Sequence, residues 1–351
     1  MLNSIAINGF KSIEAQELVL KPLTLITGVN STGKSSVIQS LLLLARHLNP
    51  QNELRMADLT ADYSEFSEVK NKYTNAKQIT LSGHSGVGSF TLTIDAVDED
   101  WQMDTHRDAF IYEPAKATDN EELFYLNANR LGQEAVAARS KLKVGNHGEF
   151  LFSAFEQRKN EPLHRDLCVY PESPLLGLQV SRWLSLVTGI KTELKTETIN
   201  SSQVKVSFDF DEISDLNPFN LGAGVSFAAK IIILCLLAKK GDMVIIENPE
   251  IHLHPKSQAA LGLFFAFIAG SGIQLIIETH CEHLINKVAY QVYDEKLDSG
   301  DVVIHYKADI RTPFAEIGID GNGEYINTAN EIVSFPSGFF DATLNDLLTM
   351  R

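Results

Sequence analysis

The stretch that decides the fold is Gly28-Val29-Asn30-Ser31-Thr32-Gly33-Lys34-Ser35-Ser36, which matches the phosphate-binding pattern G-x-x-x-x-G-K-[ST] at every fixed position. Residues 23–27 before it are apolar and β-branched and indicate a buried strand, and residues 37–45 after it indicate a largely buried helix. A glycine loop between a strand and a helix N-terminus is where free backbone N–H groups bind phosphate. The alternative is a Gly- and Ser-rich turn that matches the pattern by chance.

Two residues of this loop have specific expected roles. Lys34 would reach the β- and γ-phosphates of a nucleotide, and the Ser35 hydroxyl would ligate Mg²⁺. The predicted nucleotide-binding residues of the loop are Asn30, Ser31, Thr32, Gly33, Lys34, Ser35 and Ser36.

Composition limits the class of protein. The 351 residues suffice for one large α/β domain or for two domains. An apolar content of 44% and a charged content of 21% are ordinary for a globular protein. The net charge of −15 argues against a surface that is basic all round, although it leaves room for a local basic groove that could bind nucleic acid.

The sequence also predicts the compartment. Cys168, Cys235 and Cys281 are far apart and form no C-x-x-C pair, which favours a reduced compartment. Residues 1–5 lack a basic segment followed by an apolar core, so no secretory signal is expected. The longest apolar run, residues 231–238, is too short to span a membrane. We therefore expect a cytoplasmic protein that does not bind a membrane.

The first third of the chain reads as strands. Residues 4–7 and 18–20 are predicted short strands on either side of a turn at residues 9–12. Residues 77–83 and 89–95 alternate polar and apolar side chains around a Gly-rich connection, which predicts a hairpin with one face in solvent. The acidic residues 95–108 are predicted to form an exposed loop.

The middle of the chain is less informative. Arg139, Lys141 and Lys143 form its only compact basic cluster, for which a solvated loop is the default explanation. No sustained heptad repeat is present, so no long coiled-coil arm is expected. The predicted elements here are a strand at 123–126, a helix at 183–190 and a strand at 204–210.

A second candidate anion site precedes an apolar helix. Residues 220–226 contain two glycines and a serine and open a helix predicted over residues 227–238. Such a helix start can bind an anion, but Gly-Ala-Gly also serves as an ordinary turn.

Two further buried strands end in acids. Residues 242–246 form an apolar strand that ends at Glu247, the position where a Walker B carboxylate holds Mg²⁺ directly or through water; the alternative is an acid that caps a helix. Residues 273–277 form another strand, and the His280 side chain just after it could hydrogen-bond a γ-phosphate or the attacking water. His252 and His254 lack a third metal ligand nearby, so we do not expect a zinc site.

Five motifs follow one another in a diagnostic order: Phe10-Lys11-Ser12, residues 30–36, residues 222–226, residues 247–255, and Glu278-Thr279-His280. This order resembles the ABC-type ATPases of the RecF/SMC/OLD class, in their AAA-like prokaryotic branch. The resemblance implies an α/β P-loop fold with a mixed sheet.

Residues 1–48 and 216–351 would form a composite ATPase core, and residues 49–215 would supply the remaining core strands and an inserted α+β lobe that includes the signature subdomain. Residues 335–341 also resemble a C-terminal element of small stand-alone members.

The resemblance further implies a homodimer joined head to head through ATP. Lys11 and His280 would contact the nucleotide in cis, while Gly222, Gly224 and Ser226 would contact the γ-phosphate of the partner in trans. ATP and Mg²⁺ are the expected cofactors, with Ser35 and Glu247 as the metal-binding side chains. Dimerisation would then depend on the γ-phosphate, which is a contact able to bias two states.

The chain departs from this pattern in two places. The signature reads Leu221-Gly222-Ala223-Gly224 instead of Leu-Ser-Gly-Gly, which weakens the expectation for Ser226. Asn248 stands where family members commonly have the glutamate that accepts a proton from the attacking water. An amide can orient a water but cannot take its proton. Glu250 is the nearby acid expected to substitute, and we expect slow hydrolysis and a long-lived ATP-bound dimer.

Two functions remain open. The first is a slow ATPase whose dimer switches a complex that acts on DNA or against phage. The second is a non-hydrolysing ATP-sensing scaffold that regulates a separate effector. Because residues 286–351 are too few for the nuclease domain of OLD-type members, we expect a nuclease or other effector to be a separate partner, with DNA as a further candidate partner. A P-loop kinase fits poorly, since Gly28 and Glu247 are far apart and a signature-like helix is present.

Overall fold

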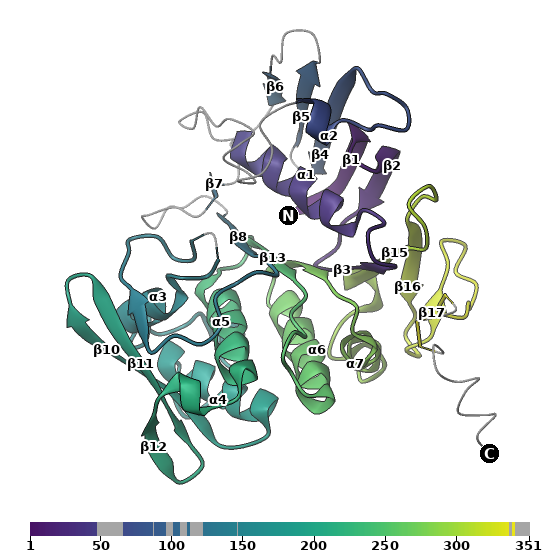
Figure 1. Cartoon of the computed structure of the whole chain (residues 1–351). Helices are drawn as coiled ribbons and strands as arrows, with labels where there is room; N and C mark the ends of the chain where they lie inside the picture. Colours follow the sequence, from purple (N-terminus) through teal and green to yellow (C-terminus); the bar gives the residue numbers. More distant parts are fainter. Residues whose placement is uncertain are drawn as a thin grey trace, which may run out of the picture.

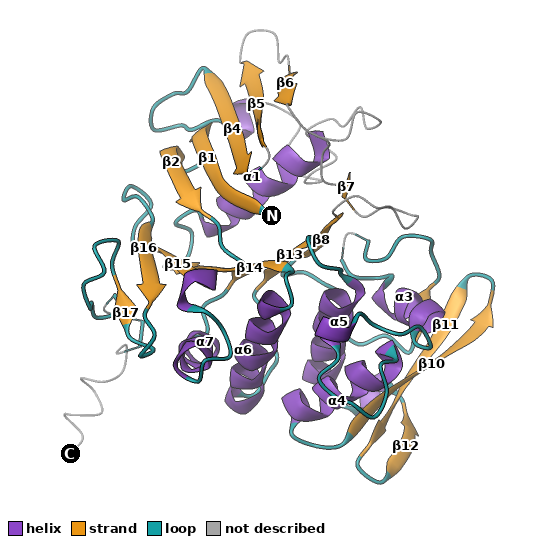
Figure 2. Ribbon diagram, turned by 180° about the vertical axis from the view of Figure 1, so that it is seen from behind, coloured by secondary structure: helices purple, strands orange, loops and turns teal. Residues whose placement is uncertain are grey.

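The apolar segments predicted as buried strands lie side by side in one central sheet (Figures 1 and 2). The computed structural model describes residues 1–47, 66–86, 88–95, 101–105, 111–112, 122–145, 147–336 and 339–340. The strand order in this sheet is β17-β16-β15-β3-β14-β13-β8-β7. The strands are β3 (Leu23–Gly28), β7 (Ile111–Tyr112), β8 (Glu122–Leu126), β13 (Met243–Glu247), β14 (Gln274–Glu278), β15 (Val302–Lys307), β16 (Ala315–Ile319) and β17 (Tyr325–Ile326).

The central sheet is mixed. The strands from β15 to β7 are parallel to their neighbours, whereas β16 and β17 are added antiparallel at one edge. Every residue of β3 and β14 is buried, as expected for parallel strands that are covered on both faces. The predicted α/β fold and the predicted core strands are confirmed. Because these strands are parallel, their carboxyl ends meet at one edge of the sheet, where α/β folds bind ligands.

A second sheet is antiparallel and lies above the central one, with α1 (Lys34–His47) between them (Figure 1). Val37, Ile38 and Leu41 of α1 belong to one apolar cluster with residues of both sheets, including Ile7 and Ile276. The strand order is β2-β1-β4-β5-β6. The strands are β1 (Leu2–Phe10), β2 (Ile13–Val19), β4 (Gln78–Ser85), β5 (Gly88–Asp95) and β6 (Trp101–Thr105).

Two predictions for this sheet fare differently. The hairpin of β4 and β5 is confirmed, and burial alternates along both strands. The exposed loop predicted for residues 95–108 is wrong at residues 101–105, which form β6 and pair with β5. The sequence did not predict this strand because β6 has only five residues and lies in an acidic segment. Its backbone forms a strand because it hydrogen-bonds to the edge of β5.

Apolar helices cover the opposite face of the central sheet (Figure 2). The helices here are α5 (Ala223–Leu237), α6 (Pro255–Gly270) and α7 (Glu282–Tyr293), while the short α2 (Phe66–Val69) lies beside the antiparallel sheet. The buried Trp183 joins α6 to the neighbouring lobe, since its ring centroid lies 4.9 Å from that of Phe264. Among the described residues, no helix has the length and apolar character that crossing a bilayer requires.

The lobe, residues 136–216, packs against α5 and α6. The predicted helix at 183–190 is confirmed but begins earlier, at Leu176, and ends at Thr188, where Gly189 adopts a left-handed φ of 76° as its cap. The elements of the lobe are α3 (Leu151–Arg158), α4 (Leu176–Thr188), β9 (Val136–Ala138), β10 (Thr192–Asn200), β11 (Gln203–Phe210) and β12 (Ile213–Leu216).

The basic cluster at residues 139–143 is not a solvated loop throughout. Arg139 and Lys141 are exposed, but Lys143 is 7% exposed and its Nζ lies 2.5 Å from Glu122 Oε2. The Lys143 ammonium also lies 5.2 Å from the centroid of the Phe124 ring. The prediction failed for Lys143 because its partner Glu122 is supplied by β8, which the local charge pattern does not reveal.

Candidate functional site

The phosphate-binding loop connects β3 to α1. Its backbone packs closely against Lys307 at Gly28 and against Ser12 at Gly33. Gly28 has φ 133° and Gly33 has φ 112°, a region that L side chains rarely adopt. A Cβ at Gly28 would collide with the Lys307 carbonyl of β15, and a Cβ at Gly33 would collide with the Ser12 hydroxyl. Both glycines are therefore required by the local geometry.

Lys34 lies folded into its own loop. It is 4% exposed, and its Nζ donates to the Val29 carbonyl at 2.7 Å, to which the Thr32 hydroxyl also donates at 2.8 Å. Burial lowers the pKa of Lys34, and the nearby Glu278 carboxylate partly opposes that shift. A phosphate group would replace the carbonyl as the stronger partner of the ammonium.

The loop opens into a cleft of about 650 Å³ that brings residues from several strand ends together. Lys11 enters from the β1–β2 turn with φ 50°, and its Nζ donates to Gln39 Oε1 at 2.5 Å. Of the predicted site residues, Thr32, Glu247, Glu250 and the signature residues do not line it. The lining residues are Lys11, Ser12, Asn30, Ser31, Gly33, Lys34, Ser35, Ser36, Gln39, Asn248, Glu278 and His280.

The acid next to Ser35 is Glu278. The Ser35 hydroxyl donates to Glu278 Oε1 at 3.0 Å, and Glu278 is 4% exposed. Its Oε2 is buried and has no hydrogen-bond partner among the described residues. Burial, reinforced by the negative charge of Glu247, raises the pKa of Glu278 to about 7, against the effects of Ser35 and Lys34.

Glu247, which was expected to hold Mg²⁺ together with Ser35, is not the acid that contacts the Ser35 hydroxyl. Glu247 Oε1 accepts from the Tyr125 hydroxyl at 3.0 Å, and Oε2 accepts from the Ala128 N–H at 3.1 Å. The physical reason is the strand order: β14 lies between β3 and β13, so the end of β14, and not that of β13, adjoins the phosphate-binding strand.

Asn248 sits in a strained turn at the edge of the cleft. Its φ is 43°, its N–H donates to the Glu278 carbonyl at 2.7 Å, and its Oδ1 is buried without a hydrogen-bond partner in the described part of the chain. Arg130 holds this turn, since Nη1 donates to the Glu247 carbonyl at 2.8 Å and Nη2 to the Asn248 carbonyl at 2.9 Å. Burial lowers the pKa of Arg130 to about 10, with the acids Glu250 and Glu247 opposing the shift.

Glu250 is engaged in holding the end of β14. Its Oε2 accepts from the Thr279 hydroxyl at 2.9 Å, and its Oε1 accepts from the His280 N–H at 2.8 Å. The acid that lines the cleft is Glu278, whereas Glu250, the expected substitute base, does not line it. Burial and the nearby Lys34 ammonium lower the pKa of His280, which favours a neutral imidazole.

The signature residues lie at the start of α5, away from this cleft. Gly222 is exposed at the N-cap with open space around it, and Gly224 packs against the His252 carbonyl. Ser226 is only 1% exposed, and its hydroxyl has no hydrogen-bond partner among the described residues. The Ser226 hydroxyl is thus buried within the single chain, whereas Gly222 is exposed and Ala223 and Gly224 are half-buried.

The two histidines between these elements have structural contacts. The backbone of His252 has φ 63°, and its ring packs on the Phe227 ring with the centroids 4.9 Å apart. His254 Nδ1 accepts a hydrogen bond from the Lys256 N–H at the start of α6. Among the described residues, no three His, Cys, Asp or Glu side chains are grouped as a metal cluster would require.

Residues 23–286, which are 264 of the 351 residues, match the family model described as "AAA domain, putative AbiEii toxin, Type IV TA system". The chain belongs to this AAA family. An OLD nuclease from Thermus scotoductus (strain ATCC 700910 / SA-01) is 25% identical over 337 residues, which cover 80% of this chain and 59% of the relative. The chain thus spans less than two thirds of that nuclease.

Solved structures show the fold of this AAA protein. An SMC head bound to the C-winged helix domain of ScpA has a TM-score of 0.51 and 12% identity, over 91% of this chain and 98% of that one. The Smc head with an extended coiled coil, bound to the C-terminal domain of ScpA derived from Pyrococcus furiosus, has a TM-score of 0.52 and 10% identity. That match covers 100% of this chain and 99% of the other chain. With the family match, these structures place the chain among P-loop ATPases of the RecF/SMC/OLD class.

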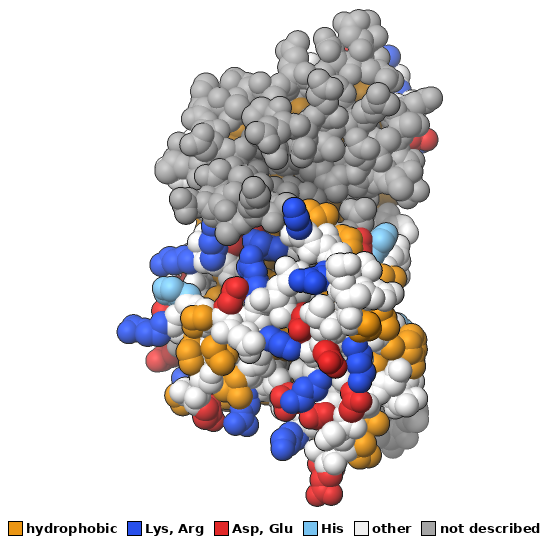
Figure 3. All heavy atoms as spheres, turned by 90° about the vertical axis from the view of Figure 1, so that its left-hand side faces the viewer, with side chains coloured by type: hydrophobic (Ala, Val, Ile, Leu, Met, Phe, Trp, Pro, Cys, Tyr) orange, Lys and Arg blue, Asp and Glu red, His pale blue; other side chains and the backbone are white. Residues whose placement is uncertain are grey.

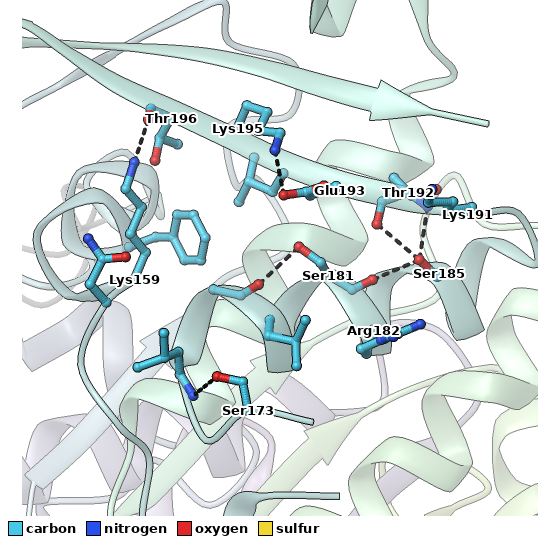
Figure 4. Close-up of a pocket in the computed structure, with 16 residues that line it drawn as sticks. Lys159, Ser173, Ser181, Arg182, Ser185, Lys191, Thr192, Glu193, Lys195 and Thr196 are labelled. Atoms are coloured by element: carbon cyan, nitrogen blue, oxygen red, sulfur yellow. Dashed lines mark hydrogen bonds and ion pairs between the residues drawn. The ribbon is translucent and has the colours of Figure 1, made fainter. Parts of the chain in front are cut away.

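A second cavity of the AAA protein, of about 580 Å³, lies in the lobe between α3, α4 and β10 (Figure 4). Its cations largely have partners already: Lys159 donates to the Thr196 carbonyl, and Lys195 donates to Glu193 at 2.5 Å. On the face of the molecule drawn in Figure 3, Lys and Arg side chains lie among Asp and Glu side chains. We assign this cavity no part in the nucleotide site.

Four contributors to the site of the AAA protein were not predicted from sequence: Ser12, Gln39, Arg130 and Glu278. Ser12 and Glu278 belong to motifs that the sequence singles out, so their positions were signalled but their contacts were not. Arg130 had one available signal, which is its place just after β8, at the edge of the sheet where the loop also lies.

Proposed function

We propose that this AAA protein binds ATP with Mg²⁺, hydrolyses it slowly, and uses the bound nucleotide to join two copies into a switch for an effector complex. The observation that carries the proposal is the cleft that gathers the P-loop, Lys11, Asn248, Glu278 and His280. Phosphate groups would meet the loop amides, the Lys34 ammonium and the N-terminus of α1.

The side chains in the cleft suit a magnesium ion bound with the nucleotide. Glu278 Oε2 and Asn248 Oδ1 are buried oxygens without hydrogen-bond donors among the described residues, and the Ser35 hydroxyl donates to the other Glu278 oxygen, Oε1. Mg²⁺ prefers oxygen ligands and commonly uses one or two carboxylates together with phosphates and water. Ser35 and an acid at this edge would hold it, and the bound ion would neutralise charge on the phosphates.

Slow hydrolysis follows from the residue at position 248. Asn248 reaches the cleft with an amide, which can orient a water but cannot accept its proton. The acid two residues later, Glu250, has both oxygens occupied by Thr279 and His280. Nothing on the β13 turn thus supplies the positioned base that typically contributes about 10²–10⁴ in rate.

The dimer is supported by the exposed start of α5. Gly222 has open space around it, and no side chain of a described residue caps the first turn of α5. Free N–H groups at a helix start bind anions. In the dimer, these groups would complete the γ-phosphate site of the partner, so that ATP and not ADP favours association.

The effector is proposed from similarity. The relative from Thermus scotoductus is called an OLD nuclease, and this chain matches 59% of its length. We propose that a nuclease or another effector responds to the nucleotide-bound dimer, with DNA or phage defence as the context. The second candidate, a scaffold that binds ATP without hydrolysing it, is favoured by the amide of Asn248.

Replacing Asn248 with glutamate should raise steady-state ADP release at least tenfold, toward the roughly 10²–10⁴-fold that a positioned base provides. The reason is that a carboxylate in the same turn could take the proton of the attacking water. Asn248→Gln is the matched control, because it lengthens the side chain without adding a base. No gain in Asn248→Glu, beside a wild type that already turns over briskly, would contradict the proposal.

The same assay separates the two candidate functions. The slow ATPase predicts ADP release by the wild type above the background of a Lys34→Ala variant, and it can be measured with and without duplex DNA. The scaffold predicts tight ATP binding with release no faster than that background in either condition.

A further inference from the structure

The Glu278 carboxylate is buried, and no positive side chain among the described residues forms an ion pair with it. Its Oε1 accepts one hydrogen bond from the Ser35 hydroxyl at 3.0 Å, and its Oε2 accepts none from the described residues. The side chain is 4% exposed. Buried carboxylate oxygens are nearly always hydrogen-bonded or bound to a cation, so an unpartnered one points to a missing partner.

The surroundings of Glu278 are rich in acceptors. Asn248 Oδ1, which lines the same cleft, is also buried without a partner in the described part of the chain. The charges that act on Glu278 are those of Glu247, Lys34 and Glu250, of which only Lys34 is positive, and its ammonium donates to Val29. Glu278, Asn248 and Ser35 line one cleft with the phosphate-binding loop, and their oxygens match the preference of Mg²⁺ for oxygen ligands and ordered water.

Glu247 is placed differently, although it occupies the expected position for the metal-binding acid. Both of its oxygens already accept hydrogen bonds, from the Tyr125 hydroxyl and the Ala128 N–H. These bonds attach the end of β13 to β8 and to the segment that leads to Arg130. Glu247 thus orders the turn that carries Asn248.

We propose that Glu278, and not Glu247, is the carboxylate that holds Mg²⁺ together with Ser35 when ATP is bound. The inference rests on the proposed function and assigns one residue within it. The strand order supports it, because β14 is hydrogen-bonded to β3 and places Glu278 beside the residue that follows Lys34, whereas β13 is one strand further away.

The test compares the affinity of each full-length variant for the slowly hydrolysed analogue ATPγS, once with Mg²⁺ and once with EDTA. The ratio of the two affinities reports the metal and does not depend on turnover. In Glu278→Gln we expect that ratio to fall at least about tenfold, since losing even an indirect partner of a metal ligand costs about 10–100-fold in metal affinity. Affinity in EDTA should stay at or above the wild-type value, because a negative charge near the phosphates is gone.

Three further variants sharpen the comparison. Glu247→Gln should keep the wild-type ratio, and Glu278→Asp should recover part of it because the carboxylate is retained. Glu282→Gln, in the first turn of α7 outside the cleft, controls for a lost acid on the same connection. Thermal unfolding without nucleotide checks that each variant is folded, and Gln at 278 can still accept the Ser35 hydrogen bond.

The outcomes are distinct. Loss of the Mg²⁺ effect in Glu278→Gln alone supports the assignment. Loss in Glu247→Gln alone, or equal loss in both variants, overturns it. A wild type that binds ATPγS equally with Mg²⁺ and with EDTA also overturns it while leaving nucleotide binding intact, whereas a wild type without any affinity for ATPγS overturns the proposed function itself.

Discussion

Replacing Lys34 with alanine should weaken ATP binding by about 10- to 100-fold, the loss expected from removing a charge-assisted hydrogen bond worth about 1.5–3 kcal/mol. Lys34 is 4% exposed, and within the described part of the chain its ammonium donates to the Val29 carbonyl. A triphosphate would supply the charged partner that this desolvated cation lacks. The effect should therefore appear in binding itself and not only in turnover.

The measurement is a titration with a fluorescent ATP analogue in Mg²⁺. Lys240→Ala is the matched control, because this exposed lysine precedes β13 at the opposite edge of the central sheet. Thermal unfolding should change little in either variant. If Lys34→Ala bound the analogue as tightly as the wild type, the loop would not be the nucleotide site.

The second large effect concerns an ion pair in the core. The Lys230 side chain in α5 is fully buried, forms an ion pair with Glu134, and places its Nζ 5.1 Å from the centroid of the Phe152 ring. Glu134→Ala should lower the free energy of unfolding by about 3–5 kcal/mol, because it leaves a buried charge without its partner. Replacing both residues, as Glu134→Ala with Lys230→Met, should recover most of that loss, since the buried charge is gone.

The loss should depend on pH in a defined direction. Burial lowers the pKa of Lys230, and Glu134 is the main group that opposes the shift. Without Glu134 the folded-state pKa falls further below the unfolded value, so the unfolded state binds more protons and stability rises with pH. Denaturant unfolding at about pH 6 and about pH 9 should therefore show a larger loss at the lower pH. A loss that persists in the double variant, or that grows with pH, would contradict this account.

The strands and helices of the core could be predicted from the sequence because each produces a local pattern of apolar residues. β3, β13 and β14 are short apolar runs that end in a glycine loop or an acid, and α5 is an apolar helix that follows glycines. Such runs indicate buried parallel strands and the edge at which they end. The clustering of the loop with Asn248 and His280 at that edge follows from the same reasoning.

The details of the site were not accessible, because they depend on which strand lies beside which. The insertion of β14 between β3 and β13 gives Ser35 the partner Glu278 and directs Glu247 toward β8. No local pattern encodes that order. Similarly, Arg130 donates to the Glu247 and Asn248 carbonyls, which lie 117 and 118 positions away in the sequence. Composition and periodicity cannot predict contacts over such separations.

Short strands in the lobe and in the antiparallel sheet also could not be predicted from the sequence. β6, β9 and β12 are short and take their hydrogen bonds from a neighbouring strand, so pairing and not intrinsic preference fixes them. The burial of Lys143 has the same origin, since Glu122 reaches it from the central sheet.

The central claim is that ATP bound in one cleft joins two copies of this chain. Size-exclusion chromatography with light scattering tests it most directly, on the wild type and Lys34→Ala, each with ATP and Mg²⁺, with ADP and Mg²⁺, and without nucleotide. The account predicts the mass of two chains for the wild type with ATP and the mass of one chain in every other sample. A wild type that remains a single chain with ATP, or that is a dimer whatever the nucleotide, would contradict it.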